Sequence, residues 1–413
     1  MPLLQRFLNG PGLADVHALG LAVSGGGDSM ALLHLAAEAG IAARAVTVDH
    51  GLRPEAALEA AEVARVCAGL GVPHDVLRWQ GWDGRGNLQD QARRARYRMI
   101  ADWARAEGLE AVALGHTRDD VAETFLMRLA RGAGVDGLAA MQARRWHEGM
   151  LWLRPLLGIG REELRDELRR RGAGWVEDPS NENLAFDRAR VRKAMKGLAG
   201  IGLGSERLAE VAGHLAEVRA ALDVQTREAA GRVQRLDRGD VLLDPAALDL
   251  PAEVLRRLLR QAILWVASAE YGPRGPALAQ ATRRLAEGRA VTLHGCRLVR
   301  RAEGLRIFRE WQAVRSLVAP VGARWDGRWC LTGPERDNPP DDKGLRIRAL
   351  GPEGLALCPD WRGTGLPRAS LLASPSVWRD GRLVAAPLAG KAAGWSAVAD
   401  PLRNDDFLSL LSH

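Results

Sequence analysis

The sequence of 413 residues has few cysteines: Cys67, Cys296, Cys330 and Cys358 lie far apart, and no two of them form a CxxC pair. This spacing argues against a zinc site, an iron–sulfur cluster and a disulfide framework, and it is typical of a reducing compartment. The chain also lacks a run of about 18 apolar residues, the length that a membrane helix needs. Residues 1–20 contain no apolar core of the kind found in signal peptides. We therefore expect a cytoplasmic protein with no membrane segment.

The composition is that of a globular protein with a basic surface. Apolar residues make up 47% of the chain, which is ample for packed cores, and the length predicts two or three domains. Lys and Arg outnumber Asp and Glu by 58 to 51, so the formal net charge is +7. Such an excess permits a polyanionic partner without requiring one.

A glycine-rich stretch near the start of the chain is the most informative local motif. It reads Ser24-Gly25-Gly26-Gly27-Asp28-Ser29. The apolar run 21–23 precedes it and helix-forming residues follow from Met30, which predicts a strand, a tight turn and a helix. Backbone N–H groups and a helix N-terminus at such a turn can bind a phosphate, and the two serines add hydroxyl donors. An ordinary strand–turn–helix corner is the alternative.

Asp28 distinguishes this stretch from other phosphate-binding loops. A carboxylate beside phosphates repels them unless a cation lies between, so Asp28 predicts Mg²⁺. A Walker A loop would need a lysine after its last glycine, and here Asp28 and Ser29 follow Gly27. The string resembles the PP-loop of the ATP pyrophosphatases, which bind the pyrophosphate of ATP and transfer AMP to an oxygen of the substrate. This resemblance implies that residues 24–29 bind ATP.

Strand and helix patterns alternate up to about residue 130. Strands are predicted at 21–23, 43–48, 72–77 and 111–114, and helices at 30–37, 55–70, 88–107 and 118–130. This alternation predicts an α/β fold with a doubly wound parallel sheet. Polar clusters follow the four strands, at 24–29, 49–53, 79–87 and 116–120. Because ligands bind at the carboxyl ends of the strands in such sheets, we expect one site there.

Two of these regions have both a structural and a functional interpretation. Asp49 directly follows the second strand, where it either caps its loop or lies near the ribose, adenine or metal of bound ATP. Arg93, Arg96 and Tyr97 share one face of the predicted helix 88–107. They either form a solvated basic face or bind phosphate, with Tyr97 offering a ring for base stacking.

The segment from Gly115 to Thr124 combines a histidine with acidic residues. Thr117 and Asp120 have the spacing of a capping box, which accounts for Asp120 without any chemistry. It does not account for His116 at the strand end or for Glu123 one turn into the helix. His116, Asp120 and Glu123 share a face, which suits metal-assisted work on a phosphate. Asp28, Asp120 and Glu123 are therefore the predicted metal ligands.

Beyond residue 130 the pattern is less regular. Glycines 132, 134 and 137 spell GxGxxG, but they follow a helix rather than a strand, so we interpret them as a flexible connection. A second basic cluster, at 186–193, contains Arg188 and Arg192. Helices are predicted at 161–171, 208–233, 255–267 and 277–285, and short strands at 291–293, 296–299 and 305–308. No elements are assigned after about residue 345.

Together these stretches resemble the tRNA(Ile)-lysidine synthetase family, most strongly over about residues 18–195. Besides the loop, the matching blocks are Asp49-His50-Gly51-Leu52-Arg53, Ala92-Arg93-x-x-Arg96-Tyr97, Gly115-His116-x-x-Asp119-Asp120-x-x-Glu123-Thr124 and Arg154-Pro155-Leu156-Leu157. The resemblance implies a PP-loop catalytic domain at 1–197, a helical tRNA-recognition domain at 198–315 and a small α+β tRNA-binding domain at 316–413. The family usually has asparagine where this chain has Ala189, so the contact expected of that amide is in doubt.

The resemblance also implies a reaction with ATP, Mg²⁺, free L-lysine and tRNA(Ile) that carries a CAU anticodon. The C2 oxygen of the wobble cytidine attacks the α-phosphate of ATP, and the amine of lysine then displaces AMP to give lysidine. By the same resemblance, Asp28, His116, Asp120 and Arg188 are catalytic residues. The residues implied to contact tRNA or phosphate are Arg93, Arg96, Tyr97 and Arg192.

Other interpretations remain open at this point. A tRNA thiolase of the same superfamily would keep the fold, but such enzymes usually have cysteines near the loop, and here only Cys67 precedes residue 290. An ATP-gated RNA-binding protein would release no pyrophosphate. The amine of lysine must lose a proton, which a nearby base or a drier site would favour, and His116 and the acidic group are the candidate bases. The oligomeric state is open as well, a homodimer being one of the states that the sequence permits.

Overall fold

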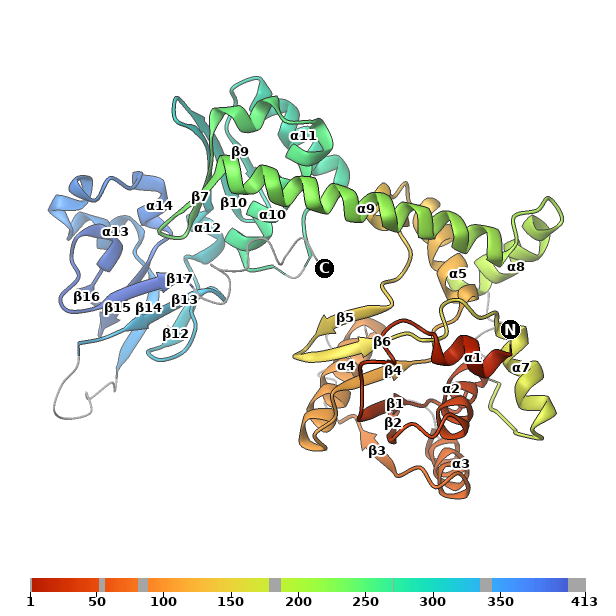
Figure 1. Ribbon diagram of the computed structural model, residues 1–413. Coiled ribbons are helices and arrows are strands. Elements are labelled where there is room, and N and C mark those ends of the chain that lie inside the picture. The colour runs from red at the N-terminus through yellow and green to blue at the C-terminus, as the bar shows by residue number, and fades with distance from the viewer. Residues whose placement is uncertain are drawn as a thin grey trace. The chain divides into compact units, whose positions relative to one another are not determined.

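The computed structural model describes residues 2–51, 56–80, 88–177, 187–269, 271–334 and 344–399, and only the backbone of Gln89. The chain divides into two compact units, Met1–Arg219 and Ala220–His413. The boundary falls inside the long helix α9 (Ser205–Val233), which Figure 1 shows in green. Among the described residues, no helix is long and apolar enough to cross a membrane.

The first unit is built on a six-stranded sheet with the order β3-β2-β1-β4-β6-β5. Its strands are β1 (Leu19–Ala22), β2 (Ala43–Asp49), β3 (His74–Arg78), β4 (Ala111–Leu114), β5 (Arg144–His147) and β6 (Met150–Leu153). Neighbouring strands are parallel except at β5, which pairs antiparallel with β6 at the edge. The strand order reverses between β1 and β4, and ligands bind at such a reversal in doubly wound sheets.

Helices cover both faces of this sheet (Figure 1). On one face, α1 (Leu3–Leu8), α2 (Gly27–Glu38), α3 (Ala56–Gly69) and α7 (Arg161–Arg170) share an apolar core with the sheet. On the other face lies α4 (Leu88–Ala106). Both faces of the sheet need a cover because successive side chains of β4 point to opposite faces. Ala111 and Ala113 point into the first core, while Val112 points into the second. The prediction of a doubly wound α/β domain is confirmed.

Two elements of the first unit differ from the sequence-based expectation. The hairpin of β5 and β6 was not predicted, although β6 is almost wholly buried. Its apolar run is only four residues long and has no periodicity that separates strand from loop. Residues 135–138, interpreted as part of a flexible connection, form the short helix α6 (Val135–Leu138) instead. That interpretation was wrong, because helix-type bonds from Leu138 and Ala139 back to Gly134 and Val135 order the segment.

A third group of helices extends from the carboxyl edge of the sheet. It contains α5 (Arg118–Leu129), α8 (Asp187–Ala199) and the first turns of α9. Val121, Ala122 and Phe125 of α5 pack against Leu208 and Ala212 of α9 in a small apolar cluster. The beginning of α9 therefore belongs to the core of the first unit.

The second unit consists of short antiparallel sheets and helices. A five-stranded sheet has the order β7-β8-β11-β10-β9, a four-stranded sheet has the order β12-β14-β15-β16, and β13 pairs with β17. The strands are β7 (Gln234–Asp237), β8 (Asp240–Leu243), β9 (Val291–Leu293), β10 (Cys296–Arg301), β11 (Gly304–Arg309), β12 (Val318–Pro320), β13 (Trp329–Thr332), β14 (Leu345–Ala349), β15 (Pro375–Arg379), β16 (Arg382–Ala385) and β17 (Ser396–Ala399). The helices are α10 (Ala252–Ala267), α11 (Gly275–Ala286), α12 (Trp311–Val314), α13 (Gly351–Ala356) and α14 (Arg368–Leu372), with short 3-10 turns η2 (Pro245–Asp249), η3 (Pro359–Thr364) and η4 (Pro387–Ala389).

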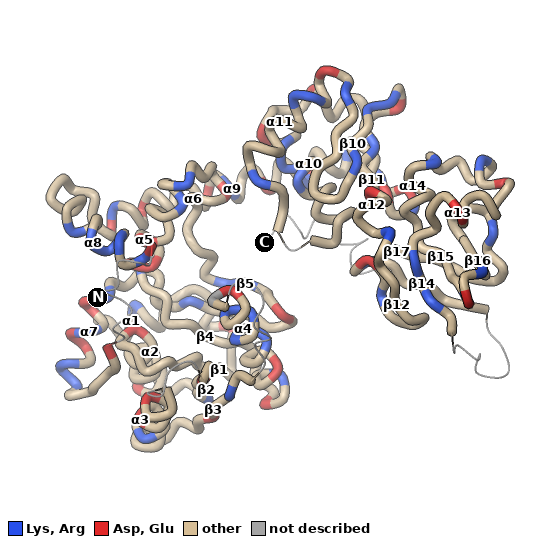
Figure 2. Tube along the Cα trace, turned by 180° about the vertical axis from the view of Figure 1, so that it is seen from behind, with Lys and Arg blue, Asp and Glu red and all other residues tan. Residues whose placement is uncertain are grey.

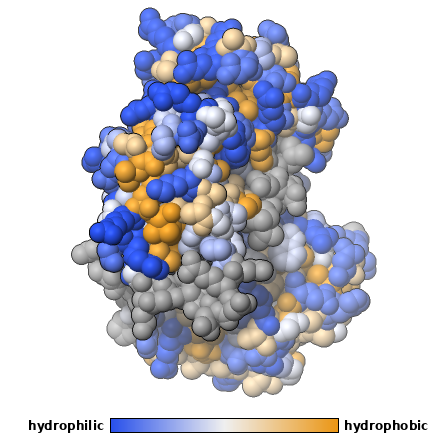
Figure 3. Space-filling view, turned by 90° about the vertical axis from the view of Figure 1, so that its left-hand side faces the viewer, coloured by the Kyte–Doolittle hydropathy of each residue, from blue (hydrophilic) through white to orange (hydrophobic). Residues whose placement is uncertain are grey.

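The segment 198–315 thus contains a complete five-stranded sheet besides its predicted helices. One apolar core includes residues of this sheet, such as Val241 and Ile307, and residues of the four-stranded sheet, such as Ile347 and Val377. On the outside, apolar residues lie in small groups between hydrophilic ones on the face shown in Figure 3, which is ordinary for a folded protein. The division into domains at 198 and 316 stays a prediction.

A buried polar network joins the five-stranded sheet of the second unit to helix α14. The Asp240 carboxylate on β8 accepts hydrogen bonds at 2.7 Å from Arg306 Nη1 and from Ser370 Oγ on α14. Arg306 also binds Asp237 at 2.8 Å. Burial raises the pKa of Asp240 to about 6, although the bonds from Ser370 and Arg306 oppose this rise.

The raised pKa of Asp240 predicts a specific pH dependence of stability. Between about pH 4 and 6 the folded state holds a proton on Asp240 that the unfolded state has lost, so stability falls as the pH rises. The expected contribution is about 3 kcal/mol across this window. Urea unfolding at pH 4 and pH 6 should show this loss in the wild type and not in Asp240→Asn. The exposed Asp244→Asn is the matched control, and parallel pH curves for wild type and Asp240→Asn would contradict the assignment.

Candidate functional site

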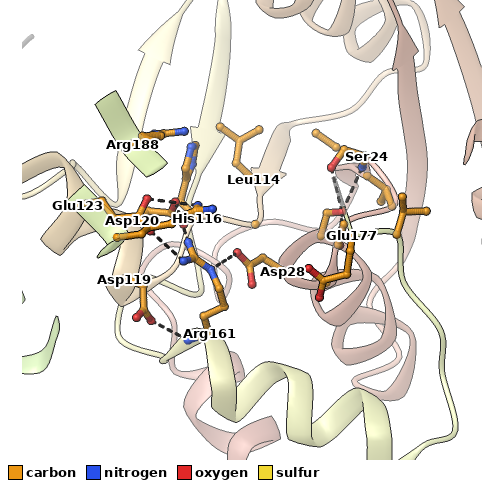
Figure 4. Close-up of a pocket in the computed structure, with 18 of the residues that line it drawn as sticks. Ser24, Asp28, Leu114, His116, Asp119, Asp120, Glu123, Arg161, Glu177 and Arg188 are labelled. Atoms are coloured by element: carbon orange, nitrogen blue, oxygen red, sulfur yellow. Dashed lines mark hydrogen bonds and ion pairs between the residues drawn. The ribbon is translucent and has the colours of Figure 1, made fainter. Parts of the chain in front are cut away.

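A cavity of about 1430 Å³ lies at the carboxyl ends of β1, β2 and β4. The predicted residues that line it are Ser24, Gly26, Gly27, Asp28, Ser29, Arg93, Arg96, Tyr97, His116, Asp120, Glu123, Arg188 and Arg192. Figure 4 shows Asp28, Asp119, Asp120, Glu123 and His116 gathered around Arg161. The structure therefore brings nearly all predicted site residues into one cavity.

The glycine-rich loop has the geometry of an anion-binding turn. Gly25 has φ +85°, a conformation that side chains with a Cβ rarely adopt. Inside the loop, Ser29 Oγ accepts a hydrogen bond from Ser24 N–H at 3.1 Å and donates one to Gly26 O at 2.9 Å. Helix α2 begins at Gly27, and no side chain caps it at Gly26. Its N-terminal dipole is therefore available to a phosphate.

A second glycine allows β4 to approach this loop closely. A Cβ on Gly115 would lie 3.0 Å from backbone atoms of Asp28 and Ser29. Any larger residue at 115 would push the loop away from the strand end. The backbone at Gly115 thereby sets the distance between the loop and the adjacent His116.

Arg161, which sequence reasoning missed, occupies the centre of the acidic group. Its Nε lies 3.1 Å from Asp28 Oδ2, Nη2 lies 3.3 Å from Asp120 Oδ1, and Nη1 lies 2.8 Å from Glu123 Oε1 (Figure 4). One signal could have identified it. Arg161 is the first residue of α7, and a cation at a helix N-terminus is electrostatically unfavourable unless something compensates it.

The contacts of Arg161 bear on the predicted metal ligands. Among the described residues, no three His, Cys, Asp or Glu side chains are grouped so that they could hold a metal ion by themselves. Asp28, Asp120 and Glu123 are instead joined through the guanidinium. Asp28 Oδ1 is buried and has no hydrogen-bond partner in the described structure. Because Mg²⁺ commonly binds one or two carboxylates together with substrate phosphates, Asp28 still suits it.

The acidic residues differ in their pKa shifts. Burial raises the pKa of Asp28, and the Arg161 guanidinium only partly offsets this rise. For Asp120 burial acts in the same direction, but Arg161 and the bonds from Thr117 outweigh it and lower the pKa. Asp120 Oδ2 accepts from Thr117 N–H at 2.8 Å, so the capping box is present as well. Asp120 thus has both the structural role and a place in the cavity.

His116 is held neutral in this environment. Burial lowers its pKa to about 4, and Arg154, Arg188 and Arg93 act in the same direction while Asp120 opposes them. Its Nδ1 is buried without a hydrogen-bond partner in the described structure. At neutral pH the ring can therefore accept a proton but carries none to donate as imidazolium.

The opposite wall of the cavity is cationic. It is formed by residues of α4 and α8, and Figure 2 shows Lys and Arg following one another along α8. Lys193 and Lys196 also line the cavity, which the sequence analysis did not predict. Arg192 Nε binds Glu123 Oε1 at 2.6 Å, so in this structure it contacts a carboxylate of the protein. Ala189 is buried in the same wall.

Tyr97 and Asp49, both predicted to contact a ligand, interact with neighbouring residues of the protein. The Tyr97 ring packs edge-on at 4.6 Å from Trp152 and 5.4 Å from His147, and the Arg93 guanidinium lies 5.6 Å from its centre. Asp49 Oδ1 accepts a hydrogen bond from Gly51 N–H at 2.8 Å, which agrees with the interpretation that Asp49 caps its loop. The neighbouring His50 lines the cavity in its place. The clusters expected at 52–53 and 81–87 lie outside the described residues.

Comparison with known proteins identifies the family. A PP-loop domain model matches residues 3–198. A tRNA(Ile)-lysidine synthase from Ruegeria pomeroyi is 53% identical over 400 residues, covering 96% of this chain and 94% of that protein. The chain belongs to the tRNA(Ile)-lysidine synthase family. A tRNA(Ile)-lysidine synthase from Zymomonas mobilis is 41% identical over 67% of this chain and 83% of its own length.

Among solved structures, a U34-tRNA thiolase from Methanococcus maripaludis is similar to this lysidine synthase family member over 52% of this chain and 78% of its own, with 18% identity and a TM-score of 0.45. The thiolase interpretation finds no support in the site. Cys67, the one cysteine before residue 290, is buried in α3, and burial raises its pKa to about 11. A thiol with that pKa is a poor carrier of sulfur, because the thiolate is the reactive form.

Proposed function

We propose that this protein ligates free L-lysine to C2 of the wobble cytidine in tRNA(Ile) with a CAU anticodon, using ATP and releasing AMP and diphosphate. The observation that carries the proposal is one cavity in which an uncapped helix N-terminus, an acidic group and a cationic wall face each other. Phosphates, an amine and RNA each find a complementary surface there. The reaction of the tRNA(Ile)-lysidine synthase family uses all three of these ligands.

In the first step the C2 oxygen of the cytidine attacks the α-phosphate, and diphosphate leaves. The amides at the start of α2 and the hydroxyls of Ser24 and Ser29 would bind the phosphates of ATP. Mg²⁺ would be held by Asp28, with Asp120 and Glu123 as the other predicted ligands. When bound, it supplies positive charge that stabilises the leaving diphosphate.

In the second step the amine of lysine attacks C2 and AMP leaves. The amine must first lose a proton, because an ε-ammonium has a pKa of about 10.4 in water. His116 can accept a proton, but with a pKa of about 4 it is a weak base in the free protein. Phosphates bound near Arg93 and Arg188 would neutralise the charges that help to lower this pKa. His116 and the carboxylates both remain candidates for the base.

The tRNA would lie along the cationic wall. Arg93, Arg96 and Arg188 line the cavity and suit bidentate contacts to phosphates of the anticodon loop or of ATP. Arg192 could join them by exchanging Glu123 for a phosphate. Tyr97 would support Arg93 more than it would stack on a base, since the Arg93 guanidinium lies over its ring, 5.6 Å from the centre, and two aromatic rings pack against it. The cytoplasmic location and the homodimer stay predictions.

The test is to incubate the protein with tRNA(Ile) bearing CAU, ATP, Mg²⁺ and labelled lysine, and then to digest the RNA. We expect labelled lysidine at the wobble position, with one AMP and one diphosphate for each lysine incorporated. Methionine tRNA, which shares the CAU anticodon, is the control and should stay unlabelled. Release of ADP, or labelling without ATP, would contradict the proposal.

A further inference from the structure

Arg161 makes a separate ion pair from each nitrogen of its guanidinium. Nε binds Asp28 of the phosphate loop, Nη1 binds Glu123 and Nη2 binds Asp120, both on α5. The guanidinium is planar and rigid, so its three nitrogens point in fixed directions. Binding all three carboxylates therefore specifies where the loop lies relative to α5.

The backbone of Arg161 is anchored on the same helix. Its own N–H donates to Asp119 Oδ2 at 2.7 Å, and Arg118 N–H donates to Ile159 O at 2.9 Å. Behind the site, Leu164 and Leu168 hold α7 in the apolar core. The side chain is 16% exposed, so little of it can move into solvent. Both the backbone and the guanidinium of Arg161 are therefore held in place.

The charges around Arg161 leave Asp28 dependent on it. Glu123 has a second cationic partner in Arg192, at 2.6 Å. Among the described residues, Arg161 is the one that forms an ion pair with Asp28, while Asp120 repels that carboxylate and raises its pKa. Without the guanidinium, Asp28 and the acidic face of α5 would repel each other. The loop would then lose its fixed distance from α5.

We propose that Arg161 is a positioning residue that fixes the phosphate-binding loop against the acidic face of α5, so that ATP and lysine react in one arrangement. The inference rests on the proposed function for its kinetic consequence, but its structural consequence does not. Lysine at 161 keeps the charge but offers one compact ammonium on a flexible chain in place of three nitrogens that point in fixed directions. Glutamine removes the charge as well.

The structural consequence is measured by hydrogen exchange on the full-length protein without substrates. In Arg161→Gln, amides of the loop at 24–29 and of α5 at 118–123 should exchange at least about tenfold faster than in the wild type. Arg161→Lys should show a smaller increase, confined to the same two segments. Arg169→Gln is the matched control, since it removes an exposed arginine two turns further along α7. Unchanged exchange in both Arg161 variants would overturn the proposal.

The kinetic consequence separates positioning from a general loss of structure. A misplacement of about 1 Å can cost about a hundredfold in rate, so kcat for lysidine formation should fall by that factor in Arg161→Gln. The KM for lysine should rise in both variants, and calorimetry should show weaker binding of ATP with Mg²⁺ only in Arg161→Gln. If Arg161→Gln does not fold, Arg161→Lys decides. Wild-type kcat, KM and exchange in a folded Arg161→Lys would refute the positioning role.

These two measurements also distinguish failure of the inference from failure of the proposed function. A wild-type protein that forms no lysidine would refute the function. Hydrogen exchange of the two segments would still report whether Arg161 holds them together. A wild-type protein that forms lysidine, with variants that do so equally well, would refute the inference alone.

Discussion

Replacing Asp28 by asparagine should reduce diphosphate release by about 10³-fold while leaving tRNA affinity within about threefold of the wild type. The asparagine side chain would keep the size of the aspartate. Because it is neutral, it would lack the negative charge that attracts Mg²⁺ and the Arg161 guanidinium. Asp28 lies in the first turn of α2, whose amides we predict to bind the phosphates, and it pairs with Arg161 at 3.1 Å. Single-turnover assays with labelled ATP and saturating tRNA measure the effect.

The control for this substitution is Asp166→Asn. Asp166 is an exposed aspartate of α7 that pairs with Arg169 at 2.5 Å and lies away from the cavity. Its replacement should leave diphosphate release unchanged. If Asp28→Asn released diphosphate at the wild-type rate, the assignment of Asp28 to the metal and phosphates would be wrong. If it lost tRNA affinity instead, Asp28 would be part of the RNA site.

A chain that ends at Arg219 should bind ATP normally but bind tRNA at least about tenfold more weakly. The cavity is lined entirely by residues of the first unit, whereas the second unit is a separate body, which we predict to grip the tRNA away from its anticodon. Each lost phosphate contact should flatten the slope of log affinity against log salt by about 0.7–0.9. The fragment should also discriminate poorly between isoleucine and methionine tRNAs.

The end point of this fragment follows from the apolar contacts of α9. Leu208 and Ala212 cover α5, so a chain cut at residue 200 would expose that face, whereas a cut after Arg219 keeps it covered. Calorimetry with ATP and a thermal unfolding curve show whether the fragment has kept its fold. Wild-type salt dependence and wild-type tRNA discrimination in a folded fragment would place recognition within the first unit.

The first unit shows how far local sequence patterns reach. Strands ending in polar clusters alternated with helices up to about residue 130, and this pattern determines a parallel sheet and the edge at which its site lies. The hairpin of β5 and β6 gave no such signal, since its four-residue strands are too short to show a period. The second unit was harder still, because its strands are only three to six residues long, which is too short to show a clear period.

The candidate site likewise contains residues that the sequence predicted and others that it did not. The loop at 24–29, His116, Asp120 and Glu123 could be named from sequence, because each follows a strand end or lies on one helix face. What could not be named was the residue that joins them. Arg161 lies 133 residues from Asp28 along the chain, and only the packing of α7 against the core brings its guanidinium to the loop.

The amino-acid sequence by itself determined the family, the glycine-rich loop between strand and helix and the doubly wound sheet, since these depend on motifs and on periods that span a few residues. Only the tertiary structure decided the partners of the carboxylates: Arg161 for Asp28, Asp120 and Glu123, Arg192 for Glu123, and for Asp240 an ion pair with Arg306 and a hydrogen bond from Ser370. Whether a charged side chain faces solvent, a ligand or another charge depends on which distant segment packs beside it. That choice is made by the burial of apolar surface across the whole unit, and no local pattern encodes it.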